Sequence, residues 1–313
     1  MYPIRAATSS DLDEAVALLT RLQAEPAHHI AYHGRGAEEI TAELRRIRPD
    51  WAAGTVLAID PAGRVRGMLV ADPDPERGRA TLHGPFVDVP ANHPAAERSW
   101  RQTADALLER VLRLPALAGG TELELSGHRR HRLLADFAAR HDFQPGDRHQ
   151  VFVLAGSALR AVLVHDARAP STMDSAVRGL PADPALRAAV AALHERGFPG
   201  APVTGAQLVA GRTGHTVVVL AGPGGLIGYA AGRARDSELA VDLVAVDPNC
   251  RSRGAGRALV RGLLRELAAR HGARARAVAV TALGNDAAER MWAALGFTLD
   301  RELVVYRRKA TGR

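Results

Sequence analysis

The most informative stretch of the chain is residues 243–259, which read LVAVDPNCRSRGAGRAL. Its apolar start predicts the end of a β-strand, which the proline of Asp247-Pro248 terminates. An apolar repeat at helical spacing begins at Leu259 and predicts a helix. A short loop that contains Gly254 and Gly256 joins the two elements, so the stretch predicts a strand, a glycine-containing loop and a helix in immediate succession.

This loop has the properties of a phosphate site. Free N–H groups at a helix N-terminus and the helix dipole attract anions, and glycines let the backbone approach a ligand closely. Three arginines add positive charge there: Arg251, Arg253 and Arg257. A dinucleotide-binding fingerprint would need glycine where Leu259 stands, and a Walker loop needs a lysine, whereas Lys309 is the only lysine in the chain.

The pattern Arg251-x-x-Gly254-x-Gly256 after a strand ending in Val-Asp-Pro resembles the acyl-CoA loop of the Gcn5-related N-acetyltransferase (GNAT) family. A second motif, Asn285-x-x-Ala288-x-x-x-Trp292-x-x-x-Gly296-Phe297, is similar to that family's next motif. The two motifs have the right separation, and the resemblance covers roughly residues 180 to 308. It implies an α+β fold, with a mixed but mostly antiparallel sheet that is splayed between two central strands and flanked by helices.

The resemblance also implies roles for individual residues. The backbone of Val244 and Val246 would pair with the pantetheine arm of acetyl-CoA, and the Val244 N–H would face the thioester oxygen. N–H groups from Ser252 to Arg257 would hold the pyrophosphate, and Asn285 would contact the arm near the thiol. The cofactor-binding residues expected in this way are Val244, Ala245, Val246, Arg251, Ser252, Arg253, Gly254, Ala255, Gly256, Arg257, Asn285 and Trp292.

Direct attack of an amine on the thioester needs a base, and Asp242 is the first candidate. It lies four residues before Val246 on one predicted strand, so a period of two places it on the face of Val244 and Val246. Glu238 is the second candidate. The alternative for Asp242 is a simple ion pair with an arginine.

An acid that could protonate the departing thiolate is less evident. Where many members of the family have a tyrosine beside the sulfur, this chain has Trp292, whose indole N–H donates a hydrogen bond but does not deliver a proton. We therefore interpret Trp292 as a packing or acyl-pocket residue. Water, Tyr229 or Tyr306 would then assist the thiolate, or the chemistry of this domain is weak.

The order of predicted elements occurs twice along the chain. In the second half we expect a hairpin, 216–231, then a strand, 238–246, and a helix, about 254–270, before a last strand–helix–strand unit. Residues 1–155 repeat this order, and Phe143 precedes Phe297 by 154 residues. We therefore predict two GNAT-like domains, 1–155 and 156–313, with a linker at about 156–183.

The first of these domains lacks the phosphate loop. The positions that correspond to Arg251, Gly254 and Gly256 are occupied by proline, Glu97 and Ser99, and a glutamate would repel phosphate. We interpret residues 1–155 as a degenerate GNAT-like domain. The apolar piece 161–164 of the predicted linker is compatible with a strand.

Composition limits the other possibilities. The 313 residues are 47% hydrophobic and 24% charged, which indicates a globular protein, and the net charge is +7. Residues 1–155 hold 19 arginines against 21 acidic residues, whereas the remainder holds 22 basic against 13 acidic residues. An anionic partner should therefore prefer the second half. Cys250 is the only cysteine, so the chain cannot form an internal disulfide, and the histidine clusters 28–33 and 128–131 have no recognised metal-ligand spacing.

Together these features predict an acyltransferase (EC 2.3.1.-) that moves acetyl from acetyl-CoA to the primary amine of a small molecule in a ternary complex. The alternatives are an acyl-CoA-binding module with little or no transferase activity and, from the basic second half, a nucleic-acid-binding protein. We expect no metal, no nucleic acid and no membrane partner, and a monomer or homodimer. The absence of a signal-like or membrane-spanning segment predicts a cytoplasmic protein.

Overall fold

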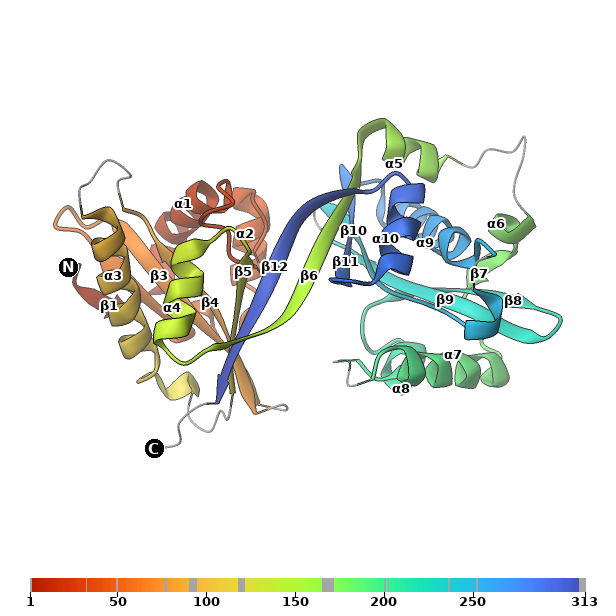
Figure 1. Cartoon of the computed structure of the whole chain (residues 1–313), viewed down its shortest axis with the longest axis horizontal. Helices are drawn as coiled ribbons and strands as arrows, with labels where there is room; N and C mark the ends of the chain where they lie inside the picture. Colours follow the sequence, from red (N-terminus) through yellow and green to blue (C-terminus); the bar gives the residue numbers. More distant parts are fainter. Residues whose placement is uncertain are drawn as a thin grey trace. The chain divides into compact units, whose positions relative to one another are not determined.

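The structure is a computed structural model, and it describes residues 2–31, 33–48, 50–75, 78–89, 95–117, 122–164, 172–199, 201, 203–235, 237–251 and 253–309. The chain forms two compact units (Figure 1). The first unit comprises residues 1–149 and 302–313, and the second comprises residues 150–301. Each unit is a sheet with helices packed against it, so the predicted mixed fold is confirmed.

The first unit is built on the sheet order β1-β2-β3-β4-β5-β12. Its elements are β1 (Ile4–Ala6), α1 (Leu12–Gln23), α2 (Ala37–Leu44), β2 (Thr55–Ile59), β3 (Val65–Asp74), β4 (Arg79–Val87), α3 (Ala96–Val111), β5 (Glu122–His128) and α4 (Arg132–Arg140). The pairs β1–β2, β2–β3, β3–β4 and β5–β12 are antiparallel, and β4–β5 is parallel. One apolar core, with Trp100, Phe86 and Phe137 among its largest side chains, holds this unit together.

The second unit is built on the sheet order β6-β11-β10-β9-β8-β7. Its elements are α5 (Gly156–Leu163), α6 (Thr172–Ala176), β7 (Val177–Gly179), α7 (Pro184–Gly197), α8 (Gly205–Val209), β8 (Thr216–Gly222), β9 (Gly225–Ala234), β10 (Glu238–Val246), α9 (Ala255–His271), β11 (Arg276–Ala282) and α10 (Asp286–Ala294). Here β7–β8, β8–β9 and β9–β10 are antiparallel, and β10–β11 is parallel.

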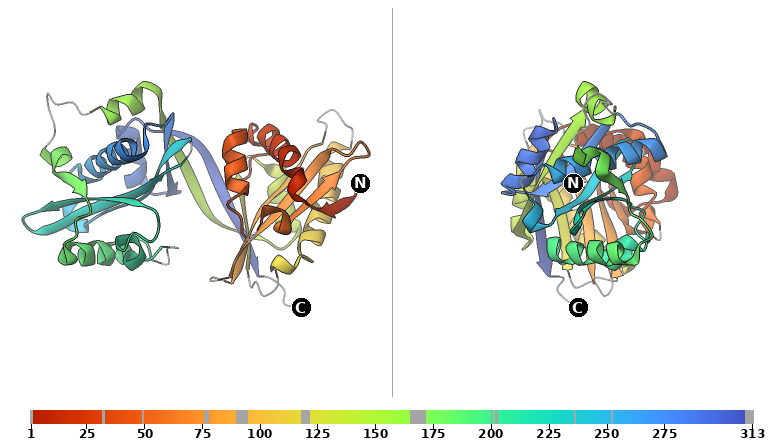
Figure 2. Two further views of the ribbon diagram at one scale, coloured as in Figure 1. Left: turned by 180° about the vertical axis from the view of Figure 1, so that it is seen from behind. Right: turned by 90° about the vertical axis from the view of Figure 1, so that its right-hand side faces the viewer.

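Two apolar clusters cover opposite faces of the second sheet. Helix α9 packs on one face, where Leu259 and Leu263 join Leu239 and Val241 of β10. Helix α7 packs on the other face, where its Val190 joins a cluster with Tyr229, Ala231 and Ala245. Figure 2 shows α9 and α7 on these opposite sides of the sheet. We call them the α9 face and the α7 face.

Two long strands pass from one unit to the other. Strand β6 (Gln144–Ala155) leaves the first unit after His149, and β12 (Thr298–Lys309) leaves the second after Arg301. Residues 303–309 of β12 then pair with β5. The predicted boundary after residue 155 therefore differs from the observed division. The sequence pattern locates a strand, but it does not show which sheet that strand joins.

The segment predicted as a linker is partly ordered structure. Residues 156–163 form helix α5, and its Leu159 and Val162 are buried in the core of the α9 face. The interpretation of residues 161–164 as a strand is wrong, because the burial of Leu159 and Val162, three residues apart, is a helical pattern. The part of the predicted linker from 165 to 171, with Pro170, lies outside the described residues.

The helix ends follow the local sequence. Helix α9 ends at Gly272, which has a φ of 82°, and Asn285 begins α10 by accepting a hydrogen bond from the Ala288 N–H at 3.2 Å. A 3-10 turn, Ser9–Asp11, precedes α1; Thr8 at its start forms a reciprocal capping box with Asp11, which is the N-cap residue of α1. Within the part of the chain that is described, no helix is long and apolar enough to span a bilayer.

Candidate active site

Strand β10 has one edge that is paired along its length and one that is paired only at its start. On the β9 side the pairing runs from Leu239 to Val246, whereas the parallel pairing with β11 ends at Val241 opposite Ala279. The two central strands therefore separate beyond this point, as the resemblance implied. The edge that follows Val241 is where an extended ligand can add to the sheet.

The backbone groups on that edge belong to Val244 and Val246. The Asp247 N–H donates to the Ile227 carbonyl of the neighbouring hairpin strand at 2.9 Å. In an antiparallel ladder only alternate residues point their N–H and C=O groups at the same neighbour. Ala245 therefore faces β9, and the N–H and C=O groups of Val244 and Val246 face the open edge. This is the orientation that pairing with a pantetheine arm requires.

The loop after β10 ends at a strained turn that glycine accommodates. Gly254 has a φ of 87° and forms the N-cap of α9, a conformation that side chains disfavour. The first intrahelical bond runs from the Ala258 N–H to the Gly254 carbonyl at 3.1 Å, so the N–H groups of Ala255, Gly256 and Arg257 precede the helical ladder. They are available to bind an anion at the positive end of a 17-residue helix.

Three arginines surround this helix end: Arg251, Arg253 and Arg257. All three are exposed, and among the described residues none of them forms an ion pair. Arg251 makes a long contact of 3.4 Å from its Nε to the Val246 carbonyl. The site thus holds positive charge that no carboxylate of the described chain neutralises. Ser252, also predicted to contribute an N–H group, lies outside the described residues.

The second glycine of the loop has a packing role. A Cβ atom at Gly256 would lie 2.7 Å from Met291 Sδ of α10 and 3.9 Å from a methyl carbon of Val246. The absence of a side chain therefore allows α9 and α10 to approach each other beside the end of β10.

The second motif supplies the start and the buried face of α10. Asn285 is exposed, and its side-chain oxygen accepts the hydrogen bond that caps this helix. The N–H groups of its side-chain amide are therefore available to donate to a ligand. Trp292 is buried, and its ring lies 5.2 Å from that of Phe297. Its indole N–H is buried and has no hydrogen-bond partner among the described residues. This placement agrees with a packing role for Trp292.

Asp242 does not lie on the predicted face. A β-bulge between Val241 and Leu243 shifts the register against β9, and beyond it Val244 and Val246 pack on the α9 face. The Asp242 carboxylate contacts Arg233, which follows Tyr229 and Ala231 at a period of two on the α7 face. The expectation that Asp242 shares a face with Val244 and Val246 is therefore wrong, because a bulge inserts one residue and breaks the alternation.

The surroundings of Asp242 hold it in the ionised form. Its Oδ2 lies 2.9 Å from Arg233 Nε and 3.2 Å from His215 Nε2, and its Oδ1 lies 3.8 Å from Arg235 Nη2. Burial raises the pKa of Asp242, but the hydrogen bonds from His215 and Arg233 and the charges of the arginines outweigh it and leave the pKa below its usual value. The predicted alternative, an ion pair with arginine, is what the side chain forms.

Glu238 is also an ion-paired residue. Its buried carboxylate lies 2.9 Å from Arg235 Nη1 and 3.1 Å from Arg276 Nε, at the start of β10 where the parallel pairing with β11 is intact. Glu238 therefore joins the start of the two central strands and lies away from the open edge.

Neither of the two tyrosines considered as acids lies at the open edge of β10. The fully buried Tyr229 hydroxyl lies 2.7 Å from His194 Nδ1, and His194 Nε2 lies 2.7 Å from the Val203 carbonyl. Since a carbonyl only accepts, His194 carries its proton on Nε2 and Tyr229 donates to Nδ1. Burial raises the pKa of Tyr229. Tyr306 pairs with Leu125 and belongs to the first unit, so it is not part of this site.

The first unit fills the corresponding opening with its own chain. Its parallel pair β4–β5 separates after Leu82 and Leu125. There the Ala31 N–H donates to the Ser126 carbonyl at 2.8 Å, and the His128 N–H donates to the His29 carbonyl at 2.9 Å. Ile30, between them, is completely buried. Residues 29–31 thus occupy the edge of β5, while the aligned loop at 90–94, which was predicted to lack the glycines, lies outside the described residues.

Histidines of both clusters make contacts inside the first unit. His33 Nε2 lies 3.0 Å from His83 Nδ1 in the core of the first unit, and His131 caps α4 by accepting from the Leu134 N–H at 3.2 Å. No group of three or more metal-ligating side chains with suitable geometry occurs in the described ranges. Cys250 is a free, half-buried thiol in the loop.

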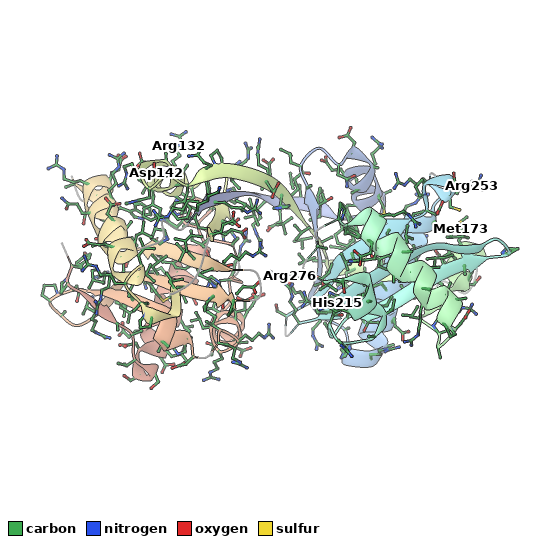
Figure 3. All side chains as sticks on the ribbon, turned by 90° about the horizontal axis from the view of Figure 1, so that it is seen from below. Arg132, Asp142, Met173, His215, Arg253 and Arg276 are labelled. Carbon is green, nitrogen blue, oxygen red and sulfur yellow. The ribbon has the colours of Figure 1, made fainter. Side chains whose placement is uncertain are left out.

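Sequence reasoning did not find His215, which lies between α8 and β8 and contacts Asp242. No linear motif includes it, because the contact depends on the antiparallel pairing of Thr216 with Gly232. Figure 3 labels His215 and Arg253 toward opposite ends of the second unit in that view.

Comparisons with known proteins agree with this geometry. The sequence model of the acetyltransferase (GNAT) family matches residues 187–297. A GCN5-related N-acetyltransferase from Sphaerobacter thermophilus has a similar fold, with a TM-score of 0.67, 16% identity, and coverage of 98% of this chain and 95% of that one. A tandem GNAT protein from the clavulanic acid biosynthesis pathway has a TM-score of 0.62 and 17% identity, with coverage of 100% and 99%. No curated protein sequence matches the chain significantly.

These likenesses extend over both units, whereas the family's sequence pattern is confined to the second. The second unit contains the loop, the open strand edge and the α10 motif. The first unit has the same fold, but its sequence lacks both motifs, and residues 29–31 pair with β5 in the corresponding gap. Residues 187–297 are therefore a domain of the acetyltransferase (GNAT) family, and the chain as a whole has the fold of a tandem GNAT protein.

Proposed function

We propose that the second unit binds acetyl-CoA and transfers its acetyl group to the primary amine of a small molecule by direct attack in a ternary complex. The observation that carries this proposal is the continuity of the site. A strand edge at Val244 and Val246, which no other strand of the described chain covers, leads through a short loop to a helix N-terminus. Three arginines that form no ion pair within the described ranges surround that helix end.

The backbone accounts for how the thioester would be held. The edge of β10 offers alternating N–H and C=O groups to the amides of the pantetheine arm, and the N–H groups from Ala255 to Arg257 receive the pyrophosphate. The Val244 N–H is then the donor for the oxygen that becomes negative when the amine attacks the carbonyl carbon. The C–N bond forms, the C–S bond breaks, and the thiolate of CoA leaves.

The first unit does not take part in cofactor binding in this proposal. Residues 29–31 pair with β5 inside the corresponding gap between β4 and β5, so we expect one acetyl-CoA per chain. The contribution of the first unit is structural: its sheet includes the last residues of β12, which begins in the second unit.

The test is calorimetric titration of acetyl-CoA into the wild type and into Gly254→Glu. The glutamate places a side chain at a φ of 87° and a negative charge at the anion site, so binding should be lost. Gly211→Glu is the matched control, because Gly211 has a φ of 72° in the same unit with nothing near its Cβ position. It should bind with a stoichiometry of one, like the wild type.

A wild type that does not bind acetyl-CoA, or a Gly254→Glu variant that binds normally, contradicts the proposal. If binding is found, a panel of alkyl, aryl, amino-acid, polyamine and aminosugar amines is assayed by thiol release. Binding without turnover of any amine favours the second candidate, an acyl-CoA-binding module. The observation behind that candidate is that neither Tyr229 nor Tyr306 has a free hydroxyl at the open edge.

A further inference from the structure

Six histidines of the first unit form three facing pairs around one short segment. This segment, residues 28–31 with His33, is called the insert, and its residues 29–31 pair with β5 in the gap between β4 and β5. Each histidine of the insert faces one histidine of the surrounding structure. The ring centroids are 5.8 Å apart in His28–His131, 6.4 Å apart in His29–His128 and 4.8 Å apart in His33–His83.

An uncharged side chain anchors the insert to helix α1. Residues 29–31 and His33 are buried, and so is Gln23 of α1. The Gln23 amide donates to the Ile30 and His33 carbonyls at 2.8 and 3.0 Å, and its oxygen accepts from the Ile30 N–H at 2.7 Å. Because glutamine does not titrate, this anchor has the same strength at every pH.

Two of the surrounding histidines are held in the neutral form by hydrogen bonds. His128 Nδ1 accepts from the Arg130 N–H at 3.0 Å, and His131 Nδ1 accepts from the Leu134 N–H at 3.2 Å. An imidazolium has no acceptor, so either ring would lose this bond on taking a proton. Burial lowers the pKa of His131, and positive charge on His28 or His128 lowers it further.

The third pair shares one hydrogen bond between two rings. His33 Nε2 lies 3.0 Å from His83 Nδ1, so one nitrogen donates and the other must keep a lone pair. Glu43 of α2 lies 3.6 Å from His33 Nδ1, and Asp72 of β3 lies 3.7 Å from His83 Nε2. The pair can therefore hold one added proton between two carboxylates. It cannot hold two, because two N–H groups would then face each other.

Burial outweighs the carboxylates near the insert. It lowers the pKa of His33 to about 4, although the charge of Asp72 acts in the opposite direction. It also lowers the pKa of His28, against the charges of Glu25 and Asp88. Both rings are therefore neutral at pH 7 while the insert is in place.

We propose that the insert is a pH-sensitive latch, which closes the gap between β4 and β5 at neutral pH and is released from β5 in mildly acidic solution while the rest of the first unit stays folded. The released histidines regain their ordinary pKa near 6.5. Each ring that is neutral in place and protonated after release multiplies the opening equilibrium by up to about tenfold per pH unit. Opening therefore increases as the pH falls from about 6.5 to about 4, where His33 also takes a proton in place.

Release would change what the first unit can bind. The Ser126 carbonyl and the His128 N–H of β5 pair with the insert, and release would leave them available to another extended segment. This inference is independent of the proposed transferase activity, because all of its residues belong to the first unit.

Hydrogen exchange of the full chain, followed by mass spectrometry at pH 7 and pH 5, tests the latch. Rates are corrected for the intrinsic effect of pH on amide exchange. Protection of the Ala31 and His128 amides should fall by about 20-fold or more at pH 5, which is the effect of one histidine with the shift of His33. Amides of β2 and β3 should keep their protection, and a return to pH 7 should restore that of the insert.

Four variants separate the histidines from the other contacts. His33→Gln should reduce the pH-dependent fall by about tenfold or more. His28→Gln, at a half-buried position, should reduce it less and serves if His33→Gln does not fold. Gln23→Met should weaken protection equally at both pH values. His141→Asn is the matched control, because His141 lies 2.7 Å from Asp105 and not against the insert, and its pH response should equal that of the wild type.

Three results would overturn the latch. They are equal protection of the insert at pH 7 and pH 5, an equal loss along β2 and β3, which would mean that acid unfolds the whole unit, and a wild-type pH response in both His33→Gln and His28→Gln. Binding of acetyl-CoA by the second unit is not affected by any of these outcomes.

Discussion

Single residues in the first unit show how burial sets the charge of an imidazole. Burial lowers the pKa of His33 to about 4 and that of His131 to about 3. In the unfolded chain these rings regain their ordinary pKa near 6.5. Below that pH the unfolded state binds protons at these histidines and the folded state does not. The free energy of unfolding therefore decreases as the pH is lowered below about 6.5.

His131→Asn tests this coupling without removing the helix cap, because asparagine also accepts at an N-cap. Between about pH 6 and pH 4 the variant should lose less stability than the wild type, by up to about 1.4 kcal/mol per pH unit. Urea unfolding is followed by tryptophan fluorescence in a Trp292→Phe background, where the remaining Trp51 and Trp100 belong to the first unit. His271→Asn, an exposed histidine of the second unit, is the control. Identical pH slopes for His131→Asn and the wild type would contradict the prediction.

At the scale of elements, the bulge in β10 decides which groups share a face. It directs Asp242 toward His215 and Arg233 while Val244 and Val246 stay on the α9 face. The strand opposite the bulge must approach closely, and Gly232 of β9 makes this possible. A Cβ atom at Gly232 would lie 2.1 Å from the Ala240 carbonyl oxygen.

Gly232→Ala should therefore destabilise the second unit by about 1–3 kcal/mol, since a backbone oxygen inside a sheet cannot move aside cheaply. Gly224→Ala, in the hairpin turn between β8 and β9, is the matched control, because nothing lies within 4 Å of its Cβ position. Denaturant unfolding of the two variants provides the comparison. Equal stabilities would mean that β9 relaxes around the methyl group and that the close approach is not required.

At the scale of the whole molecule, the two units share their last strands. Residues 303–309 of β12 pair with β5, so the sheet of the first unit includes residues from the opposite end of the chain. The first unit should therefore depend on residues that follow the GNAT domain.

Removal of residues 302–313 should expose the edge of β5 and speed amide hydrogen exchange along residues 122–128. Exchange in α9 should be affected much less, because its core lies in the second unit. A chain cut after Lys309 keeps the β5–β12 pairs and is the control. Unchanged protection of β5 in the shorter chain would show that this pairing contributes little to the first unit.

Much of this protein could be predicted from local sequence because local chemistry determines it. The loop after β10, the Asn285 cap and the span of β10 depend on neighbouring residues, on apolar period and on the conformational freedom of glycine. The same local pattern sufficed to indicate the GNAT domain.

Other features were decided only by the tertiary structure, because they depend on which strands pair. A bulge is visible only against a partner strand, so the face of Asp242 and its contact with His215 could not be derived from alternation alone. Residues 29–31 pair with β5, and β12 pairs with β5 in the first unit. Both pairings join segments that lie far apart in the sequence, so no local pattern indicates them. The amino-acid sequence by itself thus determined the elements and the anion-binding loop, whereas pairing in three dimensions determined which side chains meet.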